Sequence, residues 1–398
     1  MPGQKSSINV LWLVSWYPHE NNISLGDFIQ RQAVAASKYC KVTVVGFFPK
    51  NGISVTQTEK KALNEHLEEI IIYYPDKATG WVKKIYQTFY ILSAALHVYK
   101  QTVKTLKPQL IHLHILHPIS LIGLLYALFL RIPLVISEHS SVYFRDYTSS
   151  VNWLRRYIER LVIKKSDVII VVSKPLQMAM ESLGLSGNYR IVPNVIDSLF
   201  FNQTEKIKNK NILFNWIHTS TLAEGIKDIE GILAAVKIMT LTRKDFFVTF
   251  LGGTKSLTEK YTIMGTGMGI TDFVVFHPEK SHKEMVLILQ KADAYVNFSK
   301  METFGSSVIE ALALGLPCIA TRTGIFEDWI YQNTGLLVEV GDISGLANGM
   351  QYIMDHHNQY DTSLCRDNII EKYSYNTIGS SLSKIYSCVQ DKINIEHI

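Results

Sequence analysis

The sequence ETFGSSVIEALALGLP, residues 302–317, is the most informative stretch of this chain of 398 residues. Two glutamates, Glu302 and Glu310, flank a short segment that contains Gly305, and an apolar helical run follows. A loop that leads into a helix presents backbone N–H groups and the positive end of the helix dipole, which suits a phosphate. A carboxylate on each side of that point is able to accept hydrogen bonds from sugar hydroxyls. The segment therefore predicts a site for a ligand that is both a phosphate and a sugar.

The same residues also fit a purely structural explanation. Ser307 suits the N-cap of a helix in which Glu310 reaches back to it and completes a capping box. Glu302 equally fits an ordinary exposed carboxylate, since most glutamates lie on protein surfaces. The local pattern favours neither explanation, so the rest of the chain has to decide.

Length and composition indicate two α/β domains. A chain of 398 residues exceeds one typical domain, and its apolar fraction of 47% suits large buried sheets. The formal net charge of +5 does not by itself imply nucleic acid, and we expect no nucleic-acid partner. That charge is compatible with an anionic substrate or a lipid surface.

Three features predict a cytoplasmic protein. The apolar stretch at residues 8–14 is short and lacks a small-residue cleavage site, so we expect no signal peptide. The most apolar stretch, residues 119–130, is too short to span a bilayer, which needs about 20 residues. The four cysteines are widely spaced, which is typical of free thiols in a reducing compartment.

Apolar runs of strand length alternate with helical segments throughout, which predicts doubly wound parallel sheets covered on both faces. Ligands bind such sheets at the carboxyl ends of the strands. The polar, lysine-rich segment 197–211 is interpreted as a linker between two halves. Strands are expected at residues 10–15, 42–48, 70–74, 110–116, 134–137, 168–173 and 190–195 of the first half, and at 212–219, 247–251, 273–276, 295–299, 318–321 and 335–340 of the second.

Two further patterns leave alternatives open. His112, His114 and His117 suggest metal ligands, but no acidic or cysteine partner is spaced with them. We therefore favour structural histidines at a strand end over a zinc site. Residues 80–104 are aromatic and basic; a helix that covers the sheet with its lysines in water is favoured over a helix that docks on an anionic membrane.

Taken together, these segments resemble the retaining glycosyltransferases of family 4, which have the GT-B architecture. The resemblance covers nearly the whole chain, and its centre is the pair of glutamates separated by seven residues. The matching segments are YP (17–18), GDF (26–28), VPNVID (192–197), ADA (292–294), residues 299–317 and GLLV (335–338).

The resemblance implies an α/β fold of two doubly wound, Rossmann-like domains that face each other across a deep cleft. Residues 1–197 would form an acceptor-binding domain, and residues 198–374 would form a domain that binds the nucleotide-sugar donor. Residues 375–398 would form a C-terminal helix that crosses back to the first domain.

The resemblance also implies roles for residues of the second half. Glu302 would contact the donor sugar near the reacting carbon, and Glu310 would hold the ribose hydroxyls of the nucleotide. Backbone groups around Thr303, Phe304 and Gly305 would meet the sugar and the diphosphate, which agrees with the helix-terminus argument.

Three more residues receive roles in the same way. Lys227 would neutralise the diphosphate, Gly26 would let the backbone approach the phosphates, and His139 would lie beside the acceptor. A surface lysine, a turn glycine and a structural histidine are the corresponding alternatives. Family members often carry an arginine a few residues before the lysine, whereas residues 218–226 contain none.

The implied reaction moves a sugar from a nucleotide-diphosphate sugar to an acceptor hydroxyl with retention of configuration. The acceptor would be a glycan or a lipid-linked molecule in surface polysaccharide or glycolipid synthesis, and the protein would contact the inner face of an anionic membrane. No Asp-x-Asp occurs in the chain, so we expect no essential metal and no other cofactor. A GT-B nucleotide-sugar epimerase and a non-catalytic carbohydrate- or partner-binding module are the alternatives.

Overall fold

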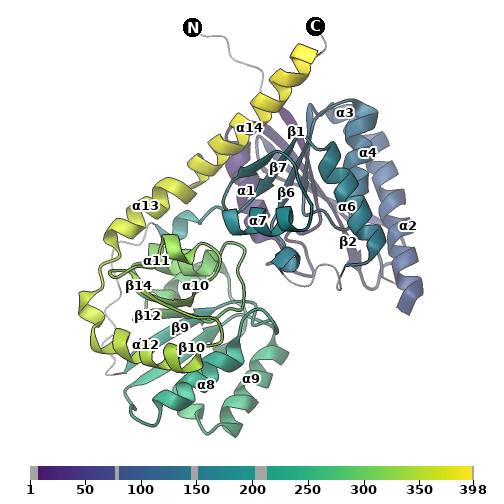
Figure 1. The fold of residues 1–398 in the computed structure, drawn as a ribbon. Helices are drawn as coiled ribbons and strands as arrows, with labels where there is room; N and C mark the ends of the chain where they lie inside the picture. Colours follow the sequence, from purple (N-terminus) through teal and green to yellow (C-terminus); the bar gives the residue numbers. More distant parts are fainter. Residues whose placement is uncertain (1–7, 77–79, 145–150, 202–212, 397–398) are drawn as a thin grey trace. The chain divides into compact units, whose positions relative to one another are not determined.

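The computed structural model describes residues 8–76, 80–144, 151–201 and 213–396 and contains two compact units (Figure 1). Unit 1 comprises residues 1–195 and 375–398, and unit 2 comprises residues 196–374. Each unit is built on a sheet of mostly parallel strands with helices on both faces. The predicted pair of doubly wound sheets is therefore correct.

Unit 1 contains an eight-stranded sheet with the order β3-β4-β2-β1-β5-β6-β7-β8. All neighbours are parallel except β3, which runs antiparallel to β4 at the edge. The strands are β1 (Asn9–Val14), β2 (Lys41–Lys50), β3 (Gln57–Asn64), β4 (Leu67–Pro75), β5 (Leu110–His114), β6 (Leu134–Glu138), β7 (Val168–Val171) and β8 (Tyr189–Ile191).

The edge strand β3 was not among the expected strands. Seven of its eight residues are exposed, and it has no apolar face that a two-residue period would reveal. Its charged side chains suit an edge position, because charges on an edge strand discourage pairing with another chain.

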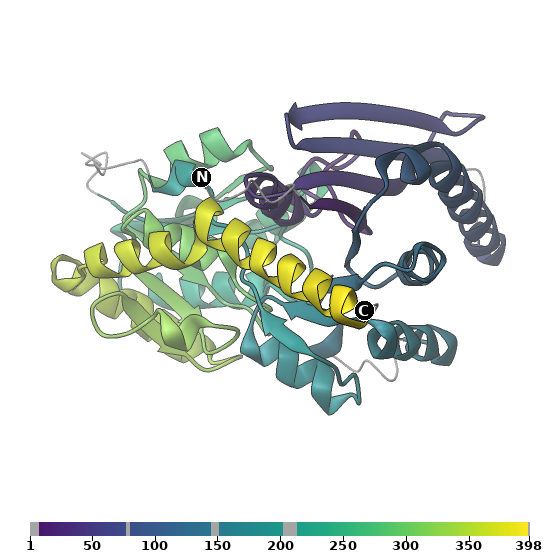
Figure 2. The same cartoon turned by 90° about the horizontal axis from the view of Figure 1, so that it is seen from above.

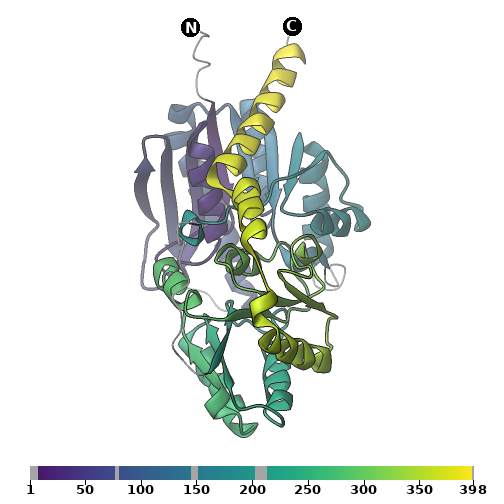
Figure 3. The ribbon, with the colours of Figure 1, turned by 90° about the vertical axis from the view of Figure 1, so that its left-hand side faces the viewer.

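Helices cover the two faces of this sheet. α1 (Asp27–Ser37) and α14 (Tyr375–Glu396) pack against each other on one face, as Figure 3 shows. α2 (Gly80–Val98), α4 (Ser120–Leu130) and α6 (Trp153–Lys165) lie side by side on the other face (Figure 2). The π-helical turn η1 (Tyr99–Val103) and α3 (Lys104–Leu106) extend α2, and η2 (Ser141–Phe144) and α7 (Lys174–Ser182) follow β6 and β7.

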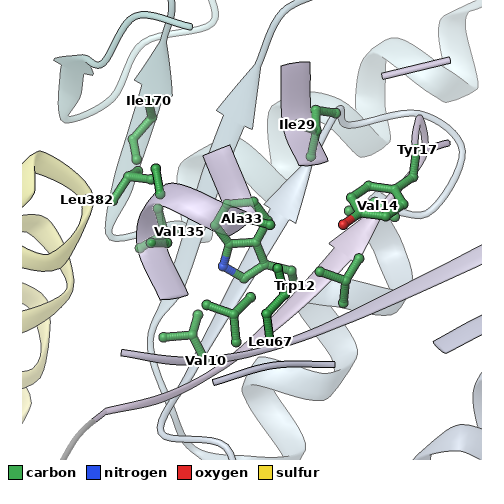
Figure 4. Close-up of a cluster of buried hydrophobic side chains, with 14 of the residues drawn as sticks. Val10, Trp12, Val14, Tyr17, Ile29, Ala33, Leu67, Val135, Ile170 and Leu382 are labelled. Atoms are coloured by element: carbon green, nitrogen blue, oxygen red, sulfur yellow. The ribbon is translucent and has the colours of Figure 1, made fainter. Parts of the chain in front are cut away.

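The core of unit 1 lies between the sheet, α1 and α14. Trp12 of β1 is fully buried at its centre. Ala33 from α1 and Leu382 from α14 pack in the same cluster, together with Val135 and Ile170 from neighbouring strands (Figure 4). The last helix of the chain therefore contributes to the core around the first strand.

Unit 2 contains a six-stranded, fully parallel sheet with the order β11-β10-β9-β12-β13-β14. Its strands are β9 (Phe214–Thr219), β10 (Phe246–Leu251), β11 (Val274–His277), β12 (Ala294–Asn297), β13 (Cys318–Thr321) and β14 (Gly335–Val338). Its helices are α8 (Ile229–Met239), α9 (Lys255–Gly267), α10 (His282–Leu289), α11 (Ser306–Ala313), α12 (Ile343–Asp355) and α13 (Ser363–Tyr373), with short 3-10 turns η3 (Ser198–Phe200), η4 (Thr271–Phe273), η5 (Phe326–Asp328) and η6 (His357–Gln359). The strand order reverses between β9 and β12, the position at which sheets of this kind bind ligands.

The expected linker at 197–211 is only partly described. Asp197 accepts a hydrogen bond from the backbone N–H of Leu199 at 2.9 Å and starts η3. Phe200 is fully buried in unit 2. The first residues of the segment are thus anchored rather than linker-like, and the remainder lies outside the described residues.

Candidate functional site

The predicted loop and helix at residues 302–317 form the start of α11. The helix begins after Gly305, which has a left-handed backbone with φ of 90°. A Cβ atom at this position would lie 2.2 Å from Cε1 of Phe326, so both the conformation and the space require glycine.

No side chain caps α11. The alternative of a capping box is therefore wrong, because Ser307 and Glu310 both lie inside the helix rather than at its cap. A helix start without a side-chain cap leaves its first N–H groups to water or to a ligand. The prediction of an anion-binding helix terminus is thus compatible with the local structure.

Glu302 lies just before this helix and is largely buried, with an exposed fraction of 9%. Its Oε1 atom forms an ion pair with Lys227 and accepts a hydrogen bond from Ser299 Oγ at 2.9 Å. Asn297 Nδ2 lies 3.4 Å from the same oxygen. The alternative of an ordinary exposed carboxylate is wrong, because Glu302 belongs to a buried cluster of polar groups.

Lys227 reaches this cluster from the loop before α8. Asp228, the next residue, caps α8 by accepting a hydrogen bond from Gly231 N at 3.1 Å. Lys227 also forms an isolated antiparallel bridge with Ser299, and its side chain is only 17% exposed. The alternative of a free surface lysine is therefore wrong, and Lys227 lies beside Glu302 although the two are far apart in sequence.

Ser299 and Thr321 support the cluster, and sequence reasoning assigned no role to either. Thr321 Oγ1 accepts from Ser299 N at 3.0 Å and donates to Ser299 O at 2.7 Å. These two hydrogen bonds hold the backbone of Ser299, whose hydroxyl then meets Glu302. Ser299 follows the buried strand β12, and Thr321 ends the buried strand β13. Their positions at strand ends were the only signal in the sequence that could have identified them.

Glu310 lies in the second turn of α11 and is 5% exposed. A carboxylate with so little exposure is unusual, since buried charges require partners. Thr303 and Phe304 form the loop between the two glutamates. The ring of Phe304 is buried and packs edge-on against Tyr373 at 5.2 Å, so this residue offers only its backbone to a ligand.

The segment that lacks the family arginine is organised by His218. Its Nδ1 donates to the carbonyl of Val296 at 2.8 Å, and its Nε2 therefore accepts from Ser220 Oγ at 2.8 Å. Burial lowers the pKa of His218 to about 4, so the ring is neutral. Within the described residues, the cation that pairs with Glu302 is Lys227 and not an arginine.

In unit 1, Gly26 precedes α1 with a left-handed backbone, φ 67°, and no side chain caps that helix. A Cβ atom at position 26 would lie 2.6 Å from the carbonyl carbon of Trp16. Close packing of the loop after β1 thus explains this glycine without any ligand. The uncapped start of α1 remains suited to an anion.

His139 follows β6 in unit 1 and is 5% exposed. Its ring lies 4.8 Å from that of Phe28, in the first turn of α1, so unit 1 brings His139 close to the helix that starts at Gly26. Neither ring nitrogen has a hydrogen-bond partner among the described residues. Buried polar atoms in proteins are normally paired, so this ring is more typical of a ligand site than of a structural histidine.

The charge state of His139 follows from its surroundings. Burial lowers its pKa to about 3, so the ring is neutral near pH 7. The side chain of Asn194 raises the pKa of His139 by a smaller amount, but it is not positioned to form a hydrogen bond with the ring. Glu138 accepts hydrogen bonds from the backbone N–H groups of His139 at 2.9 Å and Ser140 at 2.8 Å, which fixes this turn.

Of the two histidines on β5, His112 has structural surroundings. It is fully buried and pairs with Tyr386 Oη at 2.7 Å and Ser137 Oγ at 2.8 Å. His114 stacks on Trp12 with ring centroids 4.0 Å apart, and its ring nitrogens, like those of His139, have no hydrogen-bond partner among the described residues. The described residues contain no group of three His, Cys, Asp or Glu side chains that could hold a metal ion, so the zinc alternative gains no support.

Two family models match the chain. The model described as "Glycosyl transferases group 1" matches residues 201–366, and the model described as "Glycosyltransferase Family 4" matches residues 36–198. The chain therefore belongs to the family 4, group 1 glycosyltransferases, as the sequence resemblance predicted.

Curated relatives agree with this assignment. The chain is 26% identical over 247 residues to N-acetyl-alpha-D-glucosaminyl L-malate synthase of Bacillus anthracis, covering 57% of this chain and 61% of that protein. It is 25% identical over 265 residues to alpha-monoglucosyldiacylglycerol synthase of Acholeplasma laidlawii, covering 58% and 63%. The matches thus span about three fifths of the length of these relatives.

Solved structures show the same fold over nearly the whole chain. Sucrose-phosphate synthase from Thermosynechococcus elongatus has a TM-score of 0.76 at 17% identity, covering 96% of this chain and 99% of that one. HepE of Anabaena, solved in complex with UDP and glucose, has a TM-score of 0.71 at 15% identity, covering 96% and 100%. The predicted GT-B fold is therefore confirmed.

Proposed function

We propose that this protein is a retaining glycosyltransferase that moves a sugar from a nucleotide-diphosphate sugar to an acceptor hydroxyl. The observation that carries the proposal is the ion pair of Lys227 and Glu302 beside the uncapped, glycine-started N-terminus of α11. A cation and a helix N-terminus suit a diphosphate, and a carboxylate suits sugar hydroxyls. Donor binding would replace the ion pair with one contact from Lys227 to phosphate and one from Glu302 to the sugar.

The proposed chemistry breaks the bond between the anomeric carbon and the diphosphate oxygen. Negative charge develops on the departing phosphate, where Lys227 and the N–H groups of α11 stabilise it. The acceptor hydroxyl attacks the same face of the sugar and gives its proton to the departing phosphate, which retains the configuration. Glu302 would stabilise the positive charge of the oxocarbenium-like sugar.

The other predicted residues fit around this reaction. Glu310 would hold the ribose hydroxyls, and the backbone at Thr303, Phe304 and Gly305 would meet the sugar and the diphosphate. Gly26 leaves α1 without a side-chain cap, which backbone binding of a phosphate requires. The neutral ring of His139 would hydrogen-bond the acceptor hydroxyl or the sugar without acting as a cationic acid.

We further propose that no divalent metal or other cofactor takes part, because Lys227 and the α11 terminus supply positive charge for the leaving group and the sequence has no Asp-x-Asp. A glycan or a lipid-linked acceptor is proposed by analogy, since one relative is by name a synthase of the glycolipid monoglucosyldiacylglycerol. We propose that the activity belongs to surface polysaccharide or glycolipid synthesis at the cytoplasmic face of a membrane. No helix of the described residues is long and apolar enough to cross a bilayer.

A calorimetric panel of UDP, GDP, ADP and CDP without metal tests the proposal. One nucleotide is expected to bind the wild type and to bind Glu310→Ala at least about tenfold more weakly, since one hydrogen-bonded charge contributes about 1.5–3 kcal/mol. Glu259→Ala is the matched control, because Glu259 lies on the exposed side of α9 in the same unit. Binding of no nucleotide would contradict the transferase and favour a binding module; donor consumption without any acceptor would favour an epimerase.

A further inference from the structure

α4 is an unusual surface helix because it is apolar on every side. Its sequence, SLIGLLYALFL, contains no charged residue. Ile122 and Leu124 are buried within unit 1, yet Leu121, Leu128 and Phe129 are exposed, Phe129 to 72%. A helix on a protein surface normally turns polar residues to water, and one that is apolar all round normally lies in a core or a membrane.

The helices on either side of α4 continue this apolar surface. The outer stripe of α2 carries Tyr86, Phe89, Leu92 and Leu96. The favoured interpretation of residues 80–104, a helix that covers the sheet with its lysines in water, agrees with the contact of α2 with β4 and with the exposure of Lys100 and Lys104. The start of α6 adds three more exposed side chains. Among the described residues, these three helices hold 11 of the 25 exposed large apolar side chains: Tyr86, Phe89, Leu92, Leu96, Leu121, Leu125, Leu128, Phe129, Trp153, Leu154 and Tyr157.

The three helices form one continuous face. Tyr126 of α4 donates a hydrogen bond to the carbonyl of Ala95 in α2, and α4 contacts α6 directly. Figures 1 and 2 both show α2, α4 and α6 side by side on the face of the sheet opposite α1 and α14. Contiguous apolar surface of this kind marks an interaction site. We call these residues of α2, α4 and α6 the apolar face.

This part of the chain is also strongly basic. Residues 80–165 contain 12 Lys and Arg against 3 Asp and Glu, a net charge of +9, while the whole chain has +5. The acids Glu138 and Glu159 are 1% exposed, and Glu159 is paired with Arg155. The remaining residues of the chain therefore carry a net charge of −4, so the positive charge is concentrated in the part of the sequence that contains α2, α4 and α6.

We propose that the apolar face docks this protein on a bilayer that contains anionic phospholipid. Aliphatic side chains enter the acyl region, Trp153 and Tyr157 suit the interface, and Lys and Arg contact the headgroup phosphates. Two copies of a face with this positive charge repel each other, and nucleic acid offers no apolar surface for α4. α4, with 11 residues, is about 16 Å long and is too short to cross a hydrocarbon core of about 30 Å, so the protein lies on the surface rather than spanning it.

Vesicle flotation with the full chain tests this inference, which does not depend on the proposed activity. The probes are vesicles of phosphatidylcholine alone and of phosphatidylcholine with phosphatidylglycerol. The wild type is expected to float with the anionic vesicles. The double variant Leu128→Ser/Phe129→Ser is expected to bind them at least tenfold more weakly, and so is Arg160→Glu/Lys164→Glu.

The matched control is Leu241→Ser/Ile263→Ser, which removes two apolar side chains from unit 2 that are at least as exposed as Leu128 and Phe129. It is expected to float like the wild type. The far-UV circular dichroism and thermal unfolding of every variant are compared with those of the wild type, so that a failed fold is distinguished from lost docking. The inference is overturned when the wild type does not float with anionic vesicles, or when the control and the α4 variant lose binding equally. A lipid-free dimer that the α4 variant disrupts would overturn it too, because a second copy would then cover the face.

Discussion

Unit 2 and unit 1 place different chemistry at the carboxyl ends of their strands. In unit 2, Lys227 and Glu302 are charged, paired and held by hydrogen bonds from neighbouring side chains. In unit 1, His114 and His139 are buried and neutral, and their ring nitrogens have no partner among the described residues. A nucleotide diphosphate is charged and an acceptor hydroxyl is not. Under the proposed function the difference assigns the donor to unit 2 and the acceptor to unit 1.

The largest expected difference between the units is their response to acid. Burial lowers the pKa of His112, His114 and His139 in unit 1, and of His218 in unit 2. Each ring is neutral in the fold but protonates in the unfolded chain below about pH 6.5. The free energy of unfolding is therefore highest above that pH. It falls as the pH drops toward the pKa values in the folded protein, about 3 for His139 and about 4 for His218.

At pH 5.5 each histidine that stays neutral in the fold lowers the free energy of unfolding by at most about 1.4 kcal/mol. Unit 1 is thus expected to lose at most about 4 kcal/mol and unit 2 about 1.4 kcal/mol. Burial raises the pKa of Glu138, so this carboxyl stabilises unit 1 as the pH falls. It opposes the loss only in part, because it is one group against three histidines. Hydrogen exchange of peptides from β1 and β9 at pH 7.5 and 5.5 measures the two losses separately. Equal losses would contradict the comparison, and His66→Gln, an exposed site, should change neither.

The next largest effect is expected from Glu302→Gln. The amide keeps the shape and the hydrogen bond to Ser299 but removes the charge that faces the sugar. Turnover should fall about 10²-fold, as expected when one electrostatic contact to a transition state is lost. Nucleotide affinity should change little, because this carboxylate is assigned to the sugar. Steady-state kinetics and calorimetry check the two values, with Glu259→Gln as the matched control; equal losses in turnover and affinity would remove Glu302 from its assigned role.

The sequence predicted the parallel strands well because buried strands are continuous apolar runs. The strand at 318–321 was placed to the residue, and the others within a few positions. β3 was missed because an exposed, charged edge strand has neither an apolar run nor an apolar period. The antiparallel pairing of β3 was therefore not accessible from the pattern.

The site was predicted unevenly for a similar reason. Glu302 and Gly305 are close in sequence, so their local motif was visible. The ion pair with Lys227 joins residues 75 positions apart and depends on the order of β9 and β12 in the sheet. The hydrogen bond between Ser299 and Thr321 likewise depends on β12 and β13 being neighbours in the sheet. Only the folded sheet brings these side chains together.

Lys227→Ala is expected to weaken binding of the nucleoside diphosphate about tenfold and that of the nucleoside monophosphate less. The lysine is assigned to the diphosphate, and a hydrogen bond to a charged group contributes about 1.5–3 kcal/mol. The variant also leaves Glu302 without its cation, so the protein should unfold more easily. Lys227→Arg keeps the charge and controls for that loss. Equal weakening for both nucleotides would mean that Lys227 acts through folding and not through phosphate binding.

The smallest effect is expected from His139→Ala, and it concerns unit 1 alone. The neutral ring is assigned to a hydrogen bond with the acceptor or the sugar, so transfer to acceptor should fall about fivefold, the equivalent of one neutral hydrogen bond of about 1 kcal/mol. Nucleotide affinity should not change, because the nucleotide is assigned to unit 2. His139→Gln should restore part of the rate, since a glutamine also donates and accepts without charge.

The pH profile of transfer gives this prediction a second measurement. With a pKa of about 3, His139 remains neutral from pH 6 to 8. The rate of transfer should therefore depend on pH in this range in the same way for the wild type and for His139→Ala. A limb near pH 6.5 that the variant abolishes would show that a cationic imidazole takes part. Unit 1 would then hold a charge as unit 2 does, and the contrast between a charged donor site and a neutral acceptor site would no longer hold.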